Sequence, residues 1–349
     1  MNGKPNITNK TAVVIGRFEP FHNGHKDLFD CALERAESVV VILGSAFHAR
    51  TSKNPFTWEE RAAMIDQCFP EGIRERLKFI GIRDYYNDVR WAEAVRRAVE
   101  AIAPGSGEIC LFGYFKDETS RYLDWFPHWK LETIVQRLGL DATSLRKVYL
   151  EAENVDVSLA VLDPLIPTPV LQYLKAWARL PCYADIVAEH RALEAYRQSW
   201  RMAPYEPILV TVDALVQAQN HVLLVRRKGY PGKGLWALPG GFVEPKERLL
   251  QSALRELREE TGLGVHESLL QSGLKKVVVF DHPGRSARGR TITHVHYFEL
   301  RVDRLPEVSG QDDAETAAWI PLTALVSMED QFFEDHFHIL DHFFDLTLS

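Results

Sequence analysis

The first half of the chain alternates short apolar runs with amphipathic patterns. Runs rich in β-branched residues predict buried strands at 12–15, 39–43, 79–82 and 109–112. Patterns with helical spacing separate them, at about 24–37, 57–68 and 91–102. Continuous apolar strands joined by helices are typical of a parallel sheet covered on both faces. We therefore expect a doubly wound, Rossmann-like α/β domain, whose ligands bind beyond the carboxyl ends of its strands.

The second half of the chain has a different pattern. Apolar and alternating runs predict strands at 208–216, 221–226, 276–280, 291–300 and 316–320. One strong helical pattern interrupts them, from about Arg248 to Glu260. Strands mixed with a helix in this order are typical of an α+β domain.

Between the two halves lie two predicted helices and a stiff linker. Thr168 as N-cap, followed by Pro169, predicts a helix that runs to about Arg179. After a break at Leu180-Pro181, an amphipathic pattern predicts a connecting helix at 183–200, and a proline-rich linker follows at 203–207. We therefore expect a first domain at 1–182, a connecting helix and linker at 183–205, and a second domain at 206–349.

The composition is that of a globular protein that works on small molecules. The chain has 349 residues, of which 46% are hydrophobic and 26% charged, and its net charge of −7 argues against nucleic-acid binding. The four cysteines form no C-x-x-C pair, the first eleven residues are polar, and no apolar run reaches the ~18 residues of a membrane span. We expect a cytoplasmic protein with free thiols that binds neither nucleic acid nor membranes. The oligomeric state, a homo-oligomer included, stays open.

An acidic cluster ends the strong helix of the second half. Glu256, Glu259 and Glu260 stand at positions i, i+3 and i+4, so they share one helical face. Three carboxylates there repel one another unless a cation lies between them, and hard oxygen ligands suit Mg²⁺ or Mn²⁺. Gly262 is placed to end the helix in the left-handed conformation, and Gly240-Gly241 lets the backbone approach a ligand closely. The alternative is a solvated acidic helix end.

The residues around this cluster follow a longer spaced motif. Gly241, five residues, Glu247 and seven residues lead to the run Arg-Glu-Leu-Arg-Glu-Glu-Thr-Gly-Leu that begins at Arg255. The motif resembles the Nudix box, G-x5-E-x7-R-E-U-x-E-E-x-G-U with U apolar, at every fixed position. The resemblance implies metal-dependent hydrolysis of a nucleoside diphosphate linked to another group, with Glu259 and Glu260 as catalytic residues. Glu259 and Glu315 are both candidates for the general base, and a Nudix fold used only for binding is the alternative.

A basic loop between two predicted strands of the second half bears on the substrate. It reads Phe-Asp-His-Pro-Gly-Arg from Phe280 to Arg285, with two further arginines after it. It looks like the loop of Nudix proteins that act on ADP-ribose, which implies a substrate contact for Arg285. The alternative is an ordinary basic hairpin.

A second motif follows the first predicted strand directly. It runs from Gly16 through Arg17, Phe18 and His22 to His25, and it opens a helix. Backbone N–H groups and the helix dipole favour an anion at that place, and two imidazoles there can donate hydrogen bonds to phosphoryl oxygens.

This segment resembles the nucleotidyltransferases that carry an (H/T)-x-G-H signature. Their second motif, with Ser or Thr followed by Arg at the start of a late helix, is matched by Thr143, Ser144 and Arg146. The resemblance implies that His22 and His25 bind the triphosphate and that Arg146 pairs with the β- and γ-phosphates. A helix N-cap is the alternative for Thr143 and Ser144.

Further residues narrow the acceptor. Gly16, Arg17 and Phe18, together with 54–61, look like nicotinamide mononucleotide (NMN) adenylyltransferases of the archaeal type. That group places an asparagine and a tryptophan against the nicotinamide, which implies contacts for Trp91 and for Asn87 or Asp88. Core packing is the alternative for Trp91.

The chain as a whole resembles the bacterial bifunctional NMN adenylyltransferase/Nudix hydrolase family. The resemblance implies that ATP and NMN give NAD and pyrophosphate in the first domain, and that ADP-ribose gives AMP and ribose 5-phosphate in the second. Both reactions imply Mg²⁺ or Mn²⁺ as cofactor. Two alternatives stay open, a different phosphorylated acceptor for the transferase and a Nudix domain that senses ADP-ribose or NAD without hydrolysing it.

Overall fold

The computed structural model describes residues 9–104, 109–114, 124–134 and 139–347. The chain divides into two compact units, Met1–Val187 and Ala188–Ser349, which are described separately. The expectation about the first eleven residues falls mostly on residues 1–8, which lie outside the described ranges. None of the helices in the described ranges combines the length and hydropathy that a membrane span needs.

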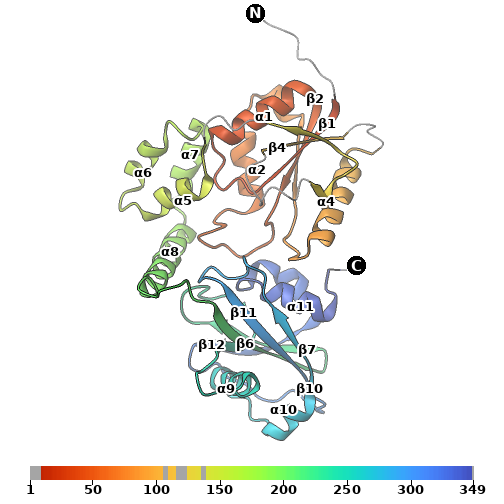
Figure 1. Cartoon of the computed structure of the whole chain (residues 1–349), viewed down its shortest axis with the longest axis vertical. Coiled ribbons are helices and arrows are strands. Elements are labelled where there is room, and N and C mark those ends of the chain that lie inside the picture. The colour runs from red at the N-terminus through yellow and green to blue at the C-terminus, as the bar shows by residue number, and fades with distance from the viewer. Residues whose placement is uncertain (1–8, 105–108, 115–123, 135–138, 348–349) are drawn as a thin grey trace, which may run out of the picture. The chain divides into compact units, whose positions relative to one another are not determined.

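The first unit is built on a five-stranded sheet in which every neighbouring pair is parallel (Figure 1). The strand order is β3-β2-β1-β4-β5. The strands are β1 (Asn9–Gly16), β2 (Ala36–Leu43), β3 (Leu77–Gly81), β4 (Ile109–Gly113) and β5 (Lys130–Thr133). The order reverses at β1, so the doubly wound parallel sheet is confirmed, with ligand chemistry expected beyond Gly16.

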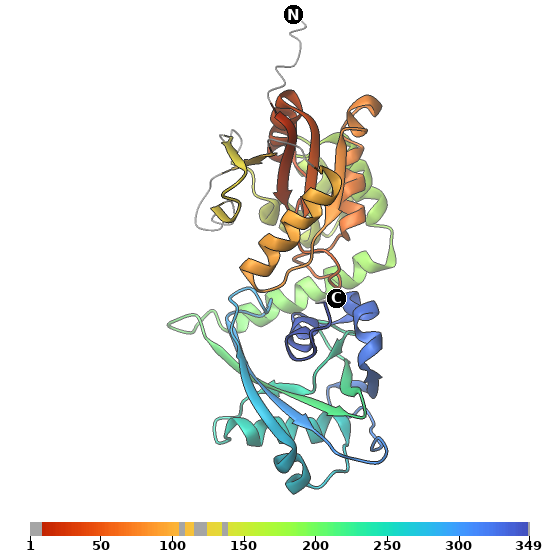
Figure 2. The same ribbon diagram turned by 90° about the vertical axis from the view of Figure 1, so that its right-hand side faces the viewer.

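Helices cover both faces of this sheet. The helices packed directly on it are α1 (Asn23–Arg35), α2 (Trp58–Asp66) and α4 (Asp88–Ile102). Side chains alternate along β1, so Ala12 and Val14 pack with α1 and α2, whereas Val13 and Ile15 pack with α4. Figures 1 and 2 show α4 on the sheet face opposite α1.

Further helices extend the core on the α1 side. They are α3 (Glu71–Arg74), α5 (Ala142–Glu151), α6 (Val155–Leu162), α7 (Thr168–Trp177) and α8 (Pro181–Ser199). Two predicted boundaries are corrected. Pro167, not Thr168, is the N-cap of α7, and it makes no side-chain cap bond. The predicted break at Leu180-Pro181 is where α8 begins, because a proline fits the first turn of a helix.

The second unit holds a seven-stranded mixed sheet. Its main path is β10-β11-β6-β7-β12, with β8 paired to β7 and β9 paired to β6. The strands are β6 (Leu209–Ala218), β7 (His221–Arg227), β8 (Trp236–Ala237), β9 (Gly240–Phe242), β10 (Leu274–Phe280), β11 (Thr291–Glu299) and β12 (Ala314–Pro321). β6 and β11 are parallel and the other pairs antiparallel, which confirms the α+β prediction.

Two helices sandwich this sheet. Its helical elements are α9 (Leu249–Thr261), α10 (Glu267–Gly273), the 3₁₀ helix η2 (Leu322–Gln331) and α11 (His336–Phe344). Ala214 and Val216 of β6 pack against α9, whereas Leu215, between them, faces α11. Figure 1 shows α9 and α11 on opposite faces of the sheet. The strong helix of the second half is therefore confirmed, and α11 is an addition that the sequence reasoning missed.

Candidate active sites

In the first unit, the loop after β1 ends in a pair of histidines that cap α1. His22 Nδ1 accepts a hydrogen bond from the His25 N–H at 3.3 Å, and His25 Nδ1 accepts one from the His22 N–H at the same distance. The two rings stack with their centroids 3.6 Å apart. Because each Nδ1 is an acceptor, the neutral rings carry their proton on Nε2. The cap therefore sets both imidazoles in the tautomer that can donate from Nε2.

Gly16 and Phe18 build the floor under this pair. A Cβ at Gly16 would lie 2.6 Å from the Phe18 ring, so only glycine fits at the end of β1. Phe18 has a φ of 56°, and its ring is buried against Phe21, His25 and Phe29. The Phe18 ring therefore supports His25 from the interior, and the substrate-binding role that the resemblance implies for Phe18 stays a prediction.

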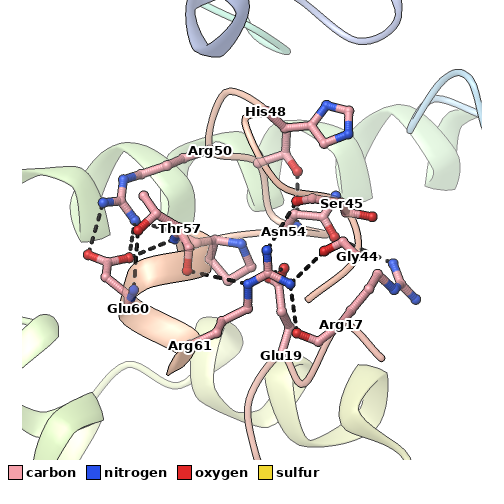
Figure 3. A network of polar contacts seen from close by, with 12 residues as sticks. Arg17, Glu19, Gly44, Ser45, His48, Arg50, Asn54, Thr57, Glu60 and Arg61 are labelled. Carbon is pink, nitrogen blue, oxygen red and sulfur yellow. Dashed lines mark hydrogen bonds and ion pairs between the residues drawn. The ribbon is translucent and has the colours of Figure 1, made fainter. Parts of the chain in front are cut away.

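Arg61 ties three segments together at the carboxyl ends of the strands (Figure 3). Its side chain is fully buried, and Nη1 donates to the carbonyl oxygens of Arg17 and Gly44 at 2.7 Å. Nη2 donates to the carbonyl oxygen of Ser45 at 3.1 Å. The loops after β1 and β2 are therefore fastened to α2 by one guanidinium, which makes Arg61 a structural cation.

Arg146 has a similar environment on α5. It is 6% exposed, and it donates to the carbonyl oxygens of Glu19 at 2.7 Å and Ser52 at 3.0 Å. Burial lowers its pKa, although the nearby Glu19 carboxylate opposes that effect. Arg17, in contrast, is exposed, with Nη1 3.4 Å from Asn54 Oδ1. The side chains of Arg61 and Arg146 are buried, whereas that of Arg17 is exposed. Arg17 is therefore the one of these three arginines that can bind a ligand without a rearrangement of the interior.

The predicted serine and threonine at the start of α5 lie at its exposed first turn. Asp141, not Thr143 or Ser144, is the N-cap. Its carboxylate accepts hydrogen bonds from the Ser144 N–H at 2.9 Å and Oγ at 3.1 Å. The Ser144 hydroxyl is thus engaged in the cap, and Thr143 lies beside it on the surface.

Trp91 and Asn87 lie at the start of α4, beyond β3. Asn87 is the N-cap, and its Oδ1 accepts from the Arg90 N–H at 3.0 Å, while Asp88 is exposed. Trp91 is half-buried and meets Trp125 and Phe126 edge to face, with centroids 5.9 and 6.1 Å away. Part of the Trp91 ring is therefore core, as the alternative reading held, and part stays accessible.

Sequence reasoning missed a polar cluster between the loops after β2 and β3. Ser45 Oγ donates to Asp84 Oδ2 at 2.7 Å, and His48 Nε2 lies 3.2 Å from the same oxygen. Their positions just after two adjacent strands were the available signal. The residues themselves match no spaced motif.

In the second unit, Arg255 forms hydrogen bonds with three glutamates of the spaced motif. Its Nε donates to both oxygens of Glu247 at 3.0 and 3.1 Å, and Nη1 donates to Glu256 and Glu259 at 2.9 Å. These hydrogen bonds raise the Arg255 pKa. The prediction that a cation lies among the carboxylates is met in part by this guanidinium, which donates to Glu256 and Glu259 and leaves the divalent cation to bind beside them.

The side chains of Glu256 and Glu260, on α9, lie close to the backbone of the short strand β9. The Gly240 N–H donates to Glu260 Oε2 at 2.9 Å, and a Cβ at Gly241 would lie 2.4 Å from Glu256 Oε1. Glu260 is 5% exposed, and burial raises its pKa to about 8. The glycine pair is required for this close approach, and Gly262 ends α9 with a φ of 57°, as predicted.

These carboxylates fit a divalent cation. Within the described ranges no three His, Cys, Asp or Glu side chains already enclose a metal position, since Arg255 and Gly240 hold the carboxylates. The donor set is nevertheless all oxygen, which Mg²⁺ and Mn²⁺ prefer. Burial raises the pKa values of Glu256 and Glu260, and a bound cation would offset that effect.

Arg285 lies in the interior rather than on an exposed hairpin. Its Nε and Nη2 donate to the two carboxylate oxygens of Asp335, each at 2.8 Å, and both side chains are at most 5% exposed. Burial raises the Asp335 pKa to about 6, although Arg285 lowers it. This buried ion pair holds the β10–β11 loop against the start of α11, and the predicted substrate contact of Arg285 stays a prediction.

The first turn of α11 also contacts the segment that leads into β9. His336 Nδ1 accepts from the Leu238 N–H at 2.9 Å, just before Gly240 and Gly241. Burial and the nearby arginines lower the pKa of His336, so its ring is neutral and this nitrogen stays an acceptor. The apolar pattern at 336–344 was the signal for α11 that the sequence reasoning passed over.

Removing the Arg285 guanidinium should destabilise the second unit. Arg285→Ala leaves a buried carboxylate without its partner, so we expect the free energy of unfolding to fall by about 3 kcal/mol. Chemical denaturation of Arg285→Ala, Asp335→Ala and the double variant measures the coupling, with Arg290→Ala in the same loop as control. An unchanged stability combined with a raised KM for ADP-ribose would instead support the predicted substrate contact of Arg285.

Comparisons with known proteins match the two halves of the chain to different families. A NUDIX domain family matches residues 207–343, and a Cytidylyltransferase-like family matches 13–107. The nicotinamide/nicotinic acid mononucleotide adenylyltransferase of Acinetobacter baylyi is 36% identical over 186 residues, which cover 52% of this chain and 94% of the relative. The ADP-ribose pyrophosphatase of Methanocaldococcus jannaschii is 33% identical over 143 residues, which cover 41% of this chain and 76% of the relative.

Solved structures of a bacterial enzyme resemble the whole chain, and one of them was obtained with ligands. It is a bifunctional NMN adenylyltransferase/ADP ribose pyrophosphatase from Francisella tularensis, complexed with AMP and a manganese ion. It is 33% identical, has a TM-score of 0.90, and covers 97% of this chain and 99% of its own.

Proposed function

Because the chain belongs to the family of bifunctional NMN adenylyltransferase/ADP-ribose pyrophosphatases, we propose specific roles for its residues in two reactions of NAD metabolism. The enzyme transfers an adenylyl group from ATP to NMN, and it hydrolyses ADP-ribose with a divalent metal. The observation that carries this function is the structural match over 97% of the chain, with both motifs in place. We assign the transfer to the first domain, 1–182, and the hydrolysis to the second, 206–349.

In the transferase, the 5′-phosphate of NMN attacks the α-phosphorus of ATP. A new P–O bond forms, the bond to the β-phosphate breaks, and pyrophosphate leaves. His22 and His25 donate from Nε2 to the triphosphate as charge develops on the leaving group, and Arg17 pairs with phosphate oxygens. Arg146 and Arg61 act from the interior, because their donors hold the loops that carry these groups. Catalysis is alignment and charge stabilisation, without a covalent enzyme intermediate.

In the hydrolase, Glu256, Glu259 and Glu260 would hold the divalent cation. When bound, the cation neutralises pyrophosphate charge and lowers the pKa of water. Glu260 is oriented by the Gly240 N–H, and Arg255 orients Glu256 and Glu259. Glu259 and Glu315 are both exposed enough to take a proton from the attacking water. Hydrolysis of the diphosphate gives AMP and ribose 5-phosphate, while Arg285 positions the neighbouring loop.

Trp91 is the residue that we propose stacks on the nicotinamide ring of NMN. Trp91→Ala should raise the KM for NMN about 10-fold with little change for ATP, because stacking on a pyridinium cation is worth ~1–2 kcal/mol. The test compares both KM values in wild type, Trp91→Ala and Trp91→Phe, together with thermal unfolding. A lower melting temperature with both KM values unchanged would leave Trp91 as a packing residue only.

The function is tested by product analysis on the pure protein. Incubation with ATP, NMN and Mg²⁺ should yield NAD and pyrophosphate, and incubation with ADP-ribose should yield AMP and ribose 5-phosphate. Phosphopantetheine in place of NMN tests the alternative acceptor. Binding of ADP-ribose without turnover, at any divalent metal concentration, would favour a sensor over a hydrolase.

A further inference from the structure

Glu19 is a buried carboxylate in the loop between β1 and α1. Its side chain is 2% exposed, and within the described ranges neither oxygen accepts a hydrogen bond. The N–H of Phe56 faces the carboxylate without reaching hydrogen-bond geometry. A buried acceptor without a donor is costly, so the folded protein holds this carboxylate at the expense of stability. Neither motif of the sequence explains why.

Positive charges on α2, α5 and the loops after β1 and β2 attract the Glu19 carboxylate. The Nε of Arg61, on α2, lies 3.5 Å from Glu19 Oε1. Arg146 on α5 and Arg17 in the same loop also attract the carboxylate, as does Lys53 in the loop after β2. Figure 3 shows Glu19 below the Arg61 guanidinium and close to Arg17. The carboxylate therefore lies among the same positive charges that border the proposed triphosphate site.

Burial outweighs the attraction of these cations. It raises the pKa of Glu19 to about 7, although Arg61, Arg146 and Arg17 each lower it. Arg61 and Arg146 are bonded to backbone carbonyls, so they keep their places when the carboxyl gains or loses its proton. Protonation of Glu19 thus changes the charge of the loop without requiring a change in its shape.

We propose that Glu19 is a positioning residue of the adenylyltransferase that sets how strongly the β1–α1 loop attracts the triphosphate of ATP. Ionised, Glu19 cancels one positive charge of the surrounding arginines; neutral, it leaves that charge to act on the ligand. The inference rests on the proposed transferase function of this unit. One unit charge at roughly 8 Å, with an effective dielectric constant of about 40, changes binding about 5-fold.

The sign follows from the raised pKa. Glu19 is neutral below about pH 7 and ionised above it, so ATP affinity should fall as the pH rises through that value. The stability that the neutral form contributes is complete below the ordinary carboxyl range and is lost as the pH rises through about 7. Glu19→Gln is neutral at every pH, so at pH 8 it should be at least as stable as the wild type and should fold.

The first test is the KM for ATP between pH 6 and 9 in NAD synthesis by the full chain. ATP itself titrates in this range, so the wild-type value is divided by that of Glu19→Gln at each pH. We expect the ratio to rise from about 1 at pH 6 to about 5 at pH 8.5. Glu59→Gln removes an exposed carboxylate next to Arg61 on α2, and its profile should follow the wild type, because water screens that charge.

A second test measures proton uptake directly. Binding of MgATP, followed by calorimetry at pH 7.5 in buffers with different ionisation enthalpies, should take up more protons in the wild type than in Glu19→Gln. Parallel KM profiles together with equal proton uptake would overturn the role of Glu19. Absence of NAD synthesis by the wild type would instead overturn the transferase function, so the two failures are distinguishable.

Discussion

Glu260→Gln is expected to lower ADP-ribose hydrolysis on the order of 10³-fold, because it removes a charged ligand of the metal that stabilises the transition state. The structure makes this a clean substitution. The glutamine oxygen can still accept from the Gly240 N–H, as Glu260 Oε2 does at 2.9 Å. Replacing a buried carboxylate by an amide should also hold or raise the stability of the metal-free protein, since burial disfavours the charged form.

The measurement is a titration of hydrolysis with Mg²⁺ and Mn²⁺ in the wild type and the variant. Glu267→Gln, an exposed carboxylate on α10 that pairs with Arg258, is the matched control. NAD synthesis by the same preparations should be unchanged, because the first unit carries that reaction. A wild-type rate with an unchanged metal dependence would remove Glu260 from the metal site.

His25→Asn is expected to lower NAD synthesis at least ~10²-fold, as for the loss of a preorganised donor to developing charge. An asparagine oxygen lies where His25 Nδ1 lies, so it can keep the hydrogen bond from the His22 N–H that caps α1. The Nε2 donor alone is lost. His25→Gln is the complementary variant, because its amide reaches the Nε2 position but not the cap.

The two variants separate catalysis from capping. We expect His25→Asn to unfold near the wild-type temperature with little NAD synthesis, and His25→Gln to keep more activity with lower stability. ADP-ribose hydrolysis is the internal control for both. If His25→Asn were fully active and His25→Gln inactive, His25 would be a helix cap and the phosphate role would be wrong.

The sequence predicted the strands of the sheets more accurately than the contacts of the arginine side chains. β1 and β2 were evident because their buried faces require unbroken β-branched runs. β9 was missed because Gly-Gly-Phe has little strand propensity, and its pairing with β6 is imposed by tertiary packing. Spaced motifs placed Glu256 and Glu260 on one helical face, since the contacts are local.

The arginines show where such reasoning stops. The local sequence around an arginine looks the same whether its guanidinium binds a ligand or donates to a buried carbonyl oxygen. Arg146 donates to the carbonyl oxygen of Glu19, 127 positions away, and Arg285 pairs with Asp335, 50 positions away. Only the fold brings these partners together. Glu19 lies within the first motif, between Phe18 and His22, but its burial among cations could not be inferred from its neighbours in the chain.

The guanidinium of Arg255 has a consequence for how the enzyme responds to metal supply. It donates to Glu256 and Glu259 from within the chain and offsets part of their repulsion, so we expect the second unit to fold without a divalent ion. We therefore expect protein made at low metal concentration to be folded but inactive as a hydrolase, and to gain activity when the ion is added. Scarcity of the ion would then stop the breakdown of ADP-ribose without unfolding the second unit.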